Sequence, residues 1–300
     1  MNGFKQHLVK LRRDIIFRIL IARRGPVAIT AGRCGFFGNL FMTLNGIHMC
    51  MKAGAKPVPF WDSRCLYFDA GLGGNVWDYY FEPITLTEGT DSKLSLLWGF
   101  KPDSGLPHNV TSEHDVRNIY CEIIRKHVVL KPSIRQTVDL ELNRIPGENY
   151  VVGVHIRQTD AARGLENRFT ANLDTYTRLI DKVISAQSRC TILLATDSQE
   201  VFASISKRYG KRLLALECIR SVDGTSVHGH YDAGVKGSPF QKGLDVIKDS
   251  YLLSKSDILI RTHSQITAFS LCLNRELSFV NVLGKFDEAR LPWLGSGISY

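Results

Sequence analysis

Long apolar runs, paired cysteines and internal repeats are absent from this sequence. No stretch of the chain approaches the roughly 20 consecutive apolar residues that a transmembrane helix needs. The 7 cysteines are scattered and form no Cys-x-x-Cys pair, which argues against a zinc site and against a disulfide scaffold. No small-residue cleavage site follows the short apolar run near the N-terminus, so no secretion signal is indicated. We therefore expect a soluble, cytoplasmic protein.

Acidic residues are in deficit. The chain has 38 lysines and arginines against 29 aspartates and glutamates, which gives a net charge of +9. A basic surface favours anionic partners such as nucleic acid, acidic lipid or a nucleotide diphosphate. Much of the excess lies in residues 5–24, where basic and apolar side chains interleave as in an amphipathic helix. That helix either packs on the domain as a solvated surface helix or makes a peripheral contact with an acidic membrane.

Nucleic-acid binding is the alternative that the charge suggests first. It predicts clustered lysines and arginines with stacking aromatic side chains in a groove. Here the excess of basic residues is concentrated at the N-terminus, and the segments after the predicted strands contain charges of both signs. We therefore expect no nucleic-acid partner, and tight, salt-sensitive binding of DNA or RNA would contradict us.

Strand and helix patterns alternate along the chain. An apolar run at 26–30 and a glycine-containing turn at 32–35 precede helical spacing over 37–52 and a strand at 56–61. This order predicts a first βαβ unit with parallel strands. No Gly-Lys-Ser/Thr phosphate loop occurs anywhere, and the glycine turn is not a Gly-x-Gly-x-x-Gly fingerprint.

The turn at 145–149 is the best candidate for a boundary between two domains, 1–148 and 149–300. Two helices are expected before it, over 112–142, the second beginning at Pro132. After it, strands and helices alternate at the spacing of a doubly wound parallel sheet, so the fold class is α/β. The predicted strands span 150–156, 190–195, 212–216, 258–260 and 277–282, and the predicted helices span 173–186, 200–209, 240–254 and 267–273.

Polar residues follow several of these strands. In an open α/β sheet, ligands bind beyond the carboxyl ends of the strands. Segments 155–160, 196–198 and 261–265 have this position in the second half, and the turn at 35–39 has it in the first. We expect all four to converge on one cleft.

These segments resemble the motifs of a known family. VGVHIRQTD, LATDS and GLDVIKDSYLLSKSDILIRTHSQ resemble three motifs of the fucosyltransferases that include the core α1,6 enzymes and the rhizobial nodulation enzyme. The match keeps order and spacing over residues 150–282, and GRCGFFGNL is similar to the glycine turn of related fucosyltransferases. Similarity to the α1,2-fucosyltransferases is weaker.

The resemblance implies a GT-B type glycosyltransferase with two facing Rossmann-like domains, the nucleotide-sugar site lying mainly in the second. It implies inverting transfer of fucose from GDP-fucose to a hydroxyl of a saccharide or glycan acceptor, with no metal and no cofactor. The sequence agrees in lacking Asp-x-Asp, the usual cation-and-diphosphate clasp of metal-dependent glycosyltransferases. The same fold with another nucleotide-sugar donor is an alternative.

Without a cation, a guanidinium must neutralise the departing diphosphate. Arg157 is our candidate, because its planar fork can bind two phosphate oxygens, although a surface ion pair also explains an arginine there. His155 lies two residues earlier on the same face and is expected to hold a phosphate or ribose oxygen, unless it is a satisfied core histidine. The family places an acidic residue like Asp249 on the nucleotide base, where an ordinary helix aspartate is the alternative. Asp197 either contacts the base or ribose or forms a strand-end turn.

The remaining candidates are expected around the diphosphate. Backbone N–H groups and a hydroxyl at Thr262, Ser264 and Gln265 suit phosphate binding, and helix capping is the alternative for the two hydroxyl residues. Gly38 and Asn39 would let the first-half turn approach the donor, as an ordinary βα turn also would.

The general base and two departures from the family pattern concern the loop after the first strand of the second half. The attacking hydroxyl must lose a proton, so Asp160 and Glu166 are candidates for the base.

The core α1,6 enzymes have a second arginine where this chain has Gln158 and a lysine where it has Ala161. These losses of charge put the details of phosphate binding and the donor in question.

Aromatic residues gather between residues 71 and 107, which we expect to form loops and short helices beside the cleft. Such side chains suit stacking on sugar rings, and core packing explains them equally well. The residues concerned are Trp77, Tyr79, Tyr80, Phe81 and Trp98.

Overall fold

The computed structural model describes residues 26–52, 54–84, 95–97, 113–159, 171–229, 234–262 and 264–283. The predicted N-terminal amphipathic helix, Trp98, Asp160 and Glu166 lie outside these residues. Within them, no helix is long and apolar enough to cross a membrane.

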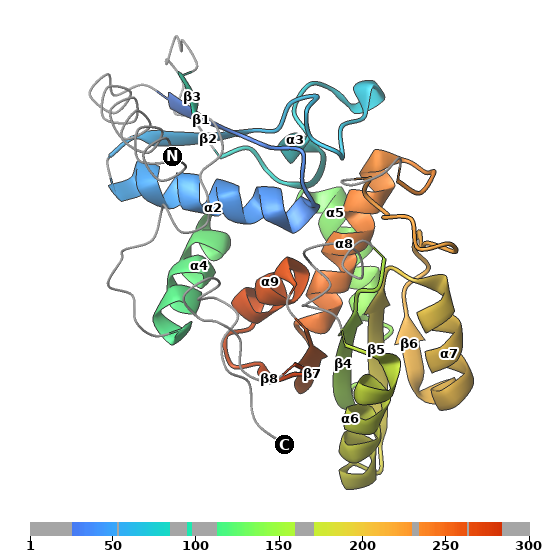
Figure 1. Cartoon of the computed structure of the whole chain (residues 1–300). Coiled ribbons are helices and arrows are strands. Elements are labelled where there is room, and N and C mark those ends of the chain that lie inside the picture. Colours follow the sequence, from blue (N-terminus) through green and yellow to red (C-terminus); the bar gives the residue numbers. More distant parts are fainter. Residues whose placement is uncertain are drawn as a thin grey trace, which may run out of the picture.

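The described chain forms two parallel sheets (Figure 1). The smaller has the order β2-β1-β3, with β1 (Pro26–Thr30) parallel to both β2 (Lys56–Phe60) and β3 (Ser95–Leu97). The predicted first βαβ unit is confirmed, since α2 (Phe36–Lys52) connects β1 to β2. The third strand, β3, was not predicted.

The larger sheet is five-stranded and entirely parallel, in the order β6-β5-β4-β7-β8. Its direction of winding reverses between β4 and β7, which makes a crevice at their carboxyl ends. The predicted α/β class and parallel sheet are confirmed. The strands are β4 (Tyr150–Ile156), β5 (Cys190–Thr196), β6 (Leu213–Ala215), β7 (Ile258–Arg261) and β8 (Ser278–Asn281).

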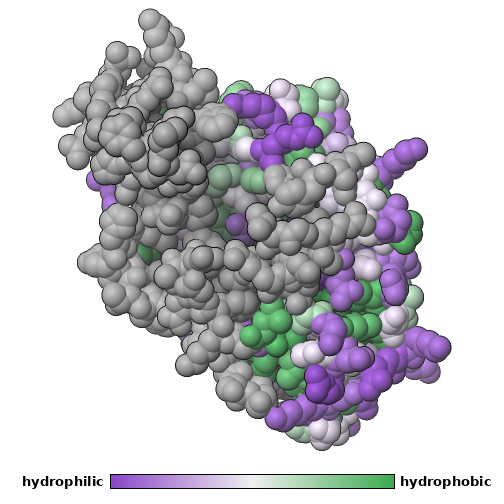
Figure 2. All heavy atoms as spheres, in the orientation of Figure 1, coloured by the Kyte–Doolittle hydropathy of each residue, from purple (hydrophilic) through white to green (hydrophobic). Residues whose placement is uncertain are grey.

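Helices cover both faces of the larger sheet. On one face, α6 (Leu173–Ala186) and α7 (Gln199–Tyr209) pack against alternate residues of β4, including Val152 and Val154. Hydrophilic side chains gather on the outer side of the region where these two helices lie (Figure 2). On the other face lie α8 (Pro239–Leu253) and α9 (Gln265–Leu273).

Helices α8 and α9 lie between the two sheets (Figure 1) and belong to the same apolar cluster as α2, α4 (Glu113–His127) and α5 (Pro132–Leu142). Polar contacts reinforce this packing. Arg117 of α4 is buried and donates from Nε and Nη2 to the carbonyls of Leu271 and Asn274, at 2.9 and 2.7 Å. A cation there neutralises the negative end of α9. The apolar core therefore continues across residue 148, and the domain boundary placed there stays a prediction.

The aromatic residues between β2 and α4 form part of this core. Trp77, Tyr79, Tyr80 and Phe81, in and just after the short helix α3 (Trp77–Tyr80), are all buried. Phe36 makes edge-to-face contacts with the rings of Tyr67 and Tyr80. For these four residues the structure therefore favours core packing over stacking on sugar rings.

Candidate functional site

A cleft opens at the carboxyl ends of β4 and β5, bounded by the turn before α2, by α8 and by the beginning of α9. It holds about 890 Å³ of empty space, part of it open to solvent. The predicted convergence of separate segments is thus observed for the described residues. The predicted residues that line the cleft are Gly38, His155, Arg157, Asp197, Asp249, Ser264 and Gln265.

Arg157 follows the last residue of β4 and is half-buried. Its Nη2 lies 3.3 Å from Nε2 of His228, a residue of the segment between β6 and α8. The guanidinium also lowers the pKa of neighbouring groups: it is the second cause, after burial, of the lowered pKa of His155. Arg157 therefore brings a permanent positive charge to the wall of the cleft.

His155 is buried on the β4 face that is turned toward α8 and α9. Burial, assisted by Arg157 and Arg261, lowers its pKa to about 3, so the imidazole is neutral at physiological pH. Its Nδ1 has no hydrogen-bond partner among the described residues. A satisfied core histidine would have one. The ring is thus suited to a polar ligand atom in the cleft.

Asp197 ties the end of β5 to the loop after β4. Its two carboxylate oxygens accept hydrogen bonds from the backbone N–H of Gln158 at 2.9 Å and the hydroxyl of Thr159 at 2.6 Å. This geometry fits the strand-end alternative, and it also fixes the backbone immediately after Arg157. Asp197 lines the cleft as well, so contact with a ligand remains a prediction.

Asp249 projects from α8 and is buried at the cleft wall. Burial is the main cause that raises its pKa to about 7, with Asp245 contributing, while Arg220 and Lys248 oppose the shift. No hydrogen bond to its carboxylate is found among the described residues. A buried carboxylate without donors needs N–H groups from a ligand or a proton, which excludes the ordinary surface aspartate.

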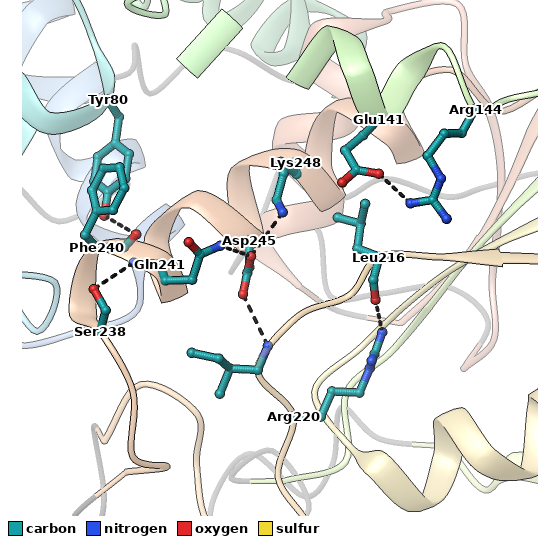
Figure 3. Close-up of polar contacts among 11 residues, drawn as sticks. Tyr80, Glu141, Arg144, Leu216, Arg220, Ser238, Phe240, Gln241, Asp245 and Lys248 are labelled. Carbon is teal, nitrogen blue, oxygen red and sulfur yellow. Dashed lines mark hydrogen bonds and ion pairs between the residues drawn. The ribbon is translucent and has the colours of Figure 1, made fainter. Parts of the chain in front are cut away.

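Asp245, one turn earlier on α8, has a different environment (Figure 3). One oxygen accepts from Nε2 of Gln241 at 2.7 Å and lies 3.3 Å from Nζ of Lys248; the other accepts from the backbone N–H of Ile219 at 3.2 Å. Asp245 therefore anchors the segment after β6 to α8. Because Cys218 and Ile219 line the cleft, this anchor shapes its wall beside Asp249.

The N-terminus of α9 opens into the cleft through Ser264, Gln265 and Ile266. Ser264 occupies the capping position, yet its side chain makes no capping hydrogen bond. The first turn also contains no acidic residue, so its N–H groups are available to an anion. Gly38 lets the first turn of α2 approach closely, since a Cβ there would lie 3.0 Å from Oε1 of Gln265.

Asn39 and Thr262 do not line the cleft. Asn39 is fully buried and braces the turn before α2: its Oδ1 accepts from the backbone N–H of Gly32 at 2.8 Å, and its Nδ2 donates to the carbonyl of Cys34 at 3.3 Å. Thr262 lies behind the cleft wall, where its hydroxyl accepts from the hydroxyl of Tyr176 at 3.2 Å. Asn39 faces inward from the first turn of α2 to brace the preceding turn, and Thr262 faces inward toward α6.

Sequence reasoning missed His228, Tyr67 and Lys242, which also line the cleft. Tyr67 is buried and accepts from the backbone N–H of Phe36 at 3.0 Å, and burial keeps its hydroxyl protonated by raising its pKa. His228 follows β6 only after a long segment, so no strand-end pattern in the sequence marks it. Tyr67 and Lys242 come from elements whose position depends on tertiary packing.

Asp160 and Glu166, the candidates for a general base, lie outside the described residues, and their roles stay predictions. Across the described part of the chain, no group of three or more His, Cys, Asp or Glu side chains is placed to hold a metal ion.

No protein-family model matches the chain, and no curated protein matches its sequence. Solved structures match it in fold. NodZ α1,6-fucosyltransferase co-crystallized with GDP has a TM-score of 0.54 at 14% identity, covering 86% of this chain and 94% of that one. NodZ soaked with GDP-fucose has a TM-score of 0.53 at 15% identity, covering 89% of this chain and 96% of that one.

NodZ comes from Bradyrhizobium. A further match is POFUT1 in complex with GDP, with a TM-score of 0.51 at 10% identity, covering 86% of this chain and 98% of that one. At such identities the likeness shows the fold alone. The resemblance to fucosyltransferases, inferred from sequence motifs, is therefore confirmed at the level of fold.

Proposed function

We propose that this protein is an inverting, metal-independent glycosyltransferase of the GT-B type, with two facing Rossmann-like domains, that transfers fucose from GDP-fucose to a saccharide hydroxyl. The observation that carries the proposal is Arg157 in a cleft that also contains the uncapped N-terminus of α9. Support comes from the fold, which is shared with fucosyltransferases solved with GDP and GDP-fucose.

The central chemical step is departure of the diphosphate. Negative charge accumulates on the leaving β-phosphate as its bond to the sugar breaks. Arg157 is a donor at the wall of the cleft, and one preorganised donor in a site from which water is excluded contributes roughly 3–4 kcal/mol to lowering the barrier. The backbone N–H groups of α9 and the hydroxyl of Ser264 supply further donors to the same group.

Recognition of the base falls to Asp249 in this proposal. Guanine presents N1–H and an exocyclic NH₂ on one edge, and a carboxylate can accept from both. A uracil edge offers one N–H between two carbonyls, and it would set an oxygen against Asp249. This argument favours a guanosine diphosphate over a uridine diphosphate donor. The attacking hydroxyl would pass its proton to Asp160 or Glu166.

The direct test is release of GDP from GDP-fucose in the presence of saccharide acceptors, with and without a chelator. We expect release that the chelator does not affect, and an absolute cation requirement would contradict the role of Arg157. Thermal-shift comparison of GDP with UDP separates the proposed donor from the alternative nucleotide sugars, since only the matching nucleotide should raise Tm.

Replacement of the proposed leaving-group donor sharpens this test. Arg157→Ala should lower turnover by roughly a hundredfold or more, because the developing charge loses its main counterion, while Tm changes little. The matched control is Arg208→Ala, which removes an exposed guanidinium paired with Asp181 at 2.5 Å on α6 and α7. Full activity in Arg157→Ala would refute the assignment.

A further inference from the structure

Residues 216–229, which follow β6, reach the cleft at Val227 and His228. Ser226 is fully buried; its hydroxyl accepts from the backbone N–H of Gly229 at 3.1 Å and its carbonyl from that of Val235 at 3.0 Å. Gly229 has a φ of +70°, which favours glycine. Nζ of Lys242, on α8, also donates to the carbonyl of Val235. His228 therefore lies on a turn that is held by hydrogen bonds from several directions.

The imidazole of His228 lies between two walls of the cleft. On one side, its Nε2 is 3.3 Å from Nη2 of Arg157. On the other, it approaches the turn before α2, since a Cβ on Gly35 would lie 3.7 Å from the ring. The segment after β6 thus joins the end of β4 to the first-half turn at the position of the guanidinium.

The chemistry of the pair fixes the role of each nitrogen. A guanidinium has five N–H donors and no acceptor. The contact is therefore a hydrogen bond only when Nε2 of His228 is the acceptor, with the ring neutral and its hydrogen on Nδ1. One N–H of Arg157 is directed at the ring, and the side chain lines the cleft. A long, flexible side chain is thereby restrained in one plane.

We propose that His228 is a positioning residue, which orients the Arg157 guanidinium toward the β-phosphate of a bound nucleoside diphosphate. This inference rests on the proposed function, because it assigns the guanidinium to the diphosphate. A bidentate arginine–phosphate contact requires the correct plane as well as the charge. The charge comes from Arg157 at the end of β4, whereas the contact that orients it comes from His228, in the segment after β6.

Two amide substitutions test the geometry with matched chemistry. In His228→Gln the amide oxygen reaches the place of Nε2, whereas in His228→Asn it reaches only the place of Nδ1. Affinities for GDP and GMP are measured by titration calorimetry, since GMP lacks the β-phosphate. We expect His228→Asn to weaken GDP binding by roughly tenfold and GMP binding by no more than about twofold, with His228→Gln close to the unchanged protein.

A double-mutant cycle identifies the route of the effect. If His228 acts through Arg157, His228→Asn in the Arg157→Ala background should cause little further loss of GDP affinity. An undiminished loss there would show direct contact with phosphate and overturn the proposal. Equal weakening of GDP and GMP, equal effects of Gln and Asn, or no effect of either would also overturn it.

Val222→Ala is the control for the same segment, because that side chain is 84% exposed and does not line the cleft. Its affinities should equal those of the unchanged protein. Failure of the unchanged protein to bind GDP would refute the proposed function together with this inference. GDP binding that weakens in Arg157→Ala and not in His228→Asn would refute the inference alone.

Discussion

The buried carboxyl of Asp249 lowers the stability of the fold when it is ionised, and in the proposed function the same carboxylate recognises the base. Burial raises the pKa of its carboxyl from 3.8 to about 7. A raised pKa means that the neutral form favours folding. The stabilisation is complete below about pH 4 and is lost as the pH rises through about 7. Asp249→Asn mimics the neutral form, and we expect it to raise the free energy of unfolding at pH 8 by roughly 2–4 kcal/mol. At pH 4 the difference should vanish, as urea denaturation at the two pH values would show.

If the proposed role in base recognition holds, the same carboxylate should make GDP binding depend on pH. Guanine N–H groups favour the ionised form, so binding should release a proton below pH 7. Affinity should fall from pH 8 to pH 6, approaching about tenfold per unit below the pKa. The nucleotide phosphate also titrates near pH 6, so Asp249→Asn provides the baseline. Parallel pH profiles for the two proteins would show that the carboxylate does not bind the base.

At the scale of elements, α9 permits a test between capping and phosphate binding. Ser264 has extended backbone angles and no capping hydrogen bond, so Ser264→Ala should cost less than about 0.5 kcal/mol of stability. GDP affinity should fall by roughly five- to tenfold, because the hydroxyl is assigned to the diphosphate. Chemical denaturation and calorimetric titration give the two quantities.

Ser238 is the matched control for that prediction. Its hydroxyl accepts from the backbone N–H of Gln241 at 3.3 Å and thus caps α8 (Figure 3). Ser238→Ala should therefore cost about 1 kcal/mol and leave GDP affinity unchanged. If Ser264→Ala showed this same pattern, Ser264 would be a cap and the diphosphate would lie elsewhere.

The elements themselves were predicted most successfully where one pattern was decisive. Strand β4 and helix α6 begin and end at the predicted residues, because the strand is buried on both faces and Asn172 caps the helix. β3 was missed because three residues are too few to show a period, and its pairing with β1 depends on chain that is distant in sequence. The formation of β3 therefore depends on tertiary packing.

The residues of the candidate site were likewise predictable where their position follows from a local pattern, and not where it depends on tertiary packing. Arg157 and Asp197 lie directly after strands, and Ser264 lies in the short connection between β7 and α9, where topology alone brings residues together. Asn39 lies instead in the first turn of α2 and faces inward, because the turn before the helix needs its amide. His228 reaches Arg157 only through the folded path of a long segment, and no local pattern in the sequence specifies that path.

At the scale of the whole molecule, the core makes the second half dependent on the first. The ring of Phe269 in α9 lies 4.8 Å from that of Phe37 in α2, and both residues are buried. Tyr80 stacks on Phe240 of α8 with centroids 5.3 Å apart and donates to its carbonyl at 2.9 Å. Removing residues 1–148 would expose these surfaces of α8 and α9. The helices that carry Asp249 and Ser264 would then lose the packing that positions them.

We therefore expect the full chain to unfold in one cooperative transition, with equal calorimetric and van't Hoff enthalpies. Residues 149–300 alone should bind a hydrophobic dye and lose most affinity for GDP, although they contain the complete five-stranded sheet. A fragment with dispersed amide signals, a sharp thermal transition and unchanged GDP affinity would contradict this. Such a fragment would show that the sheet alone holds the two helices in place, and that the apolar cluster shared with α2, α4 and α5 serves as an interface between independent domains.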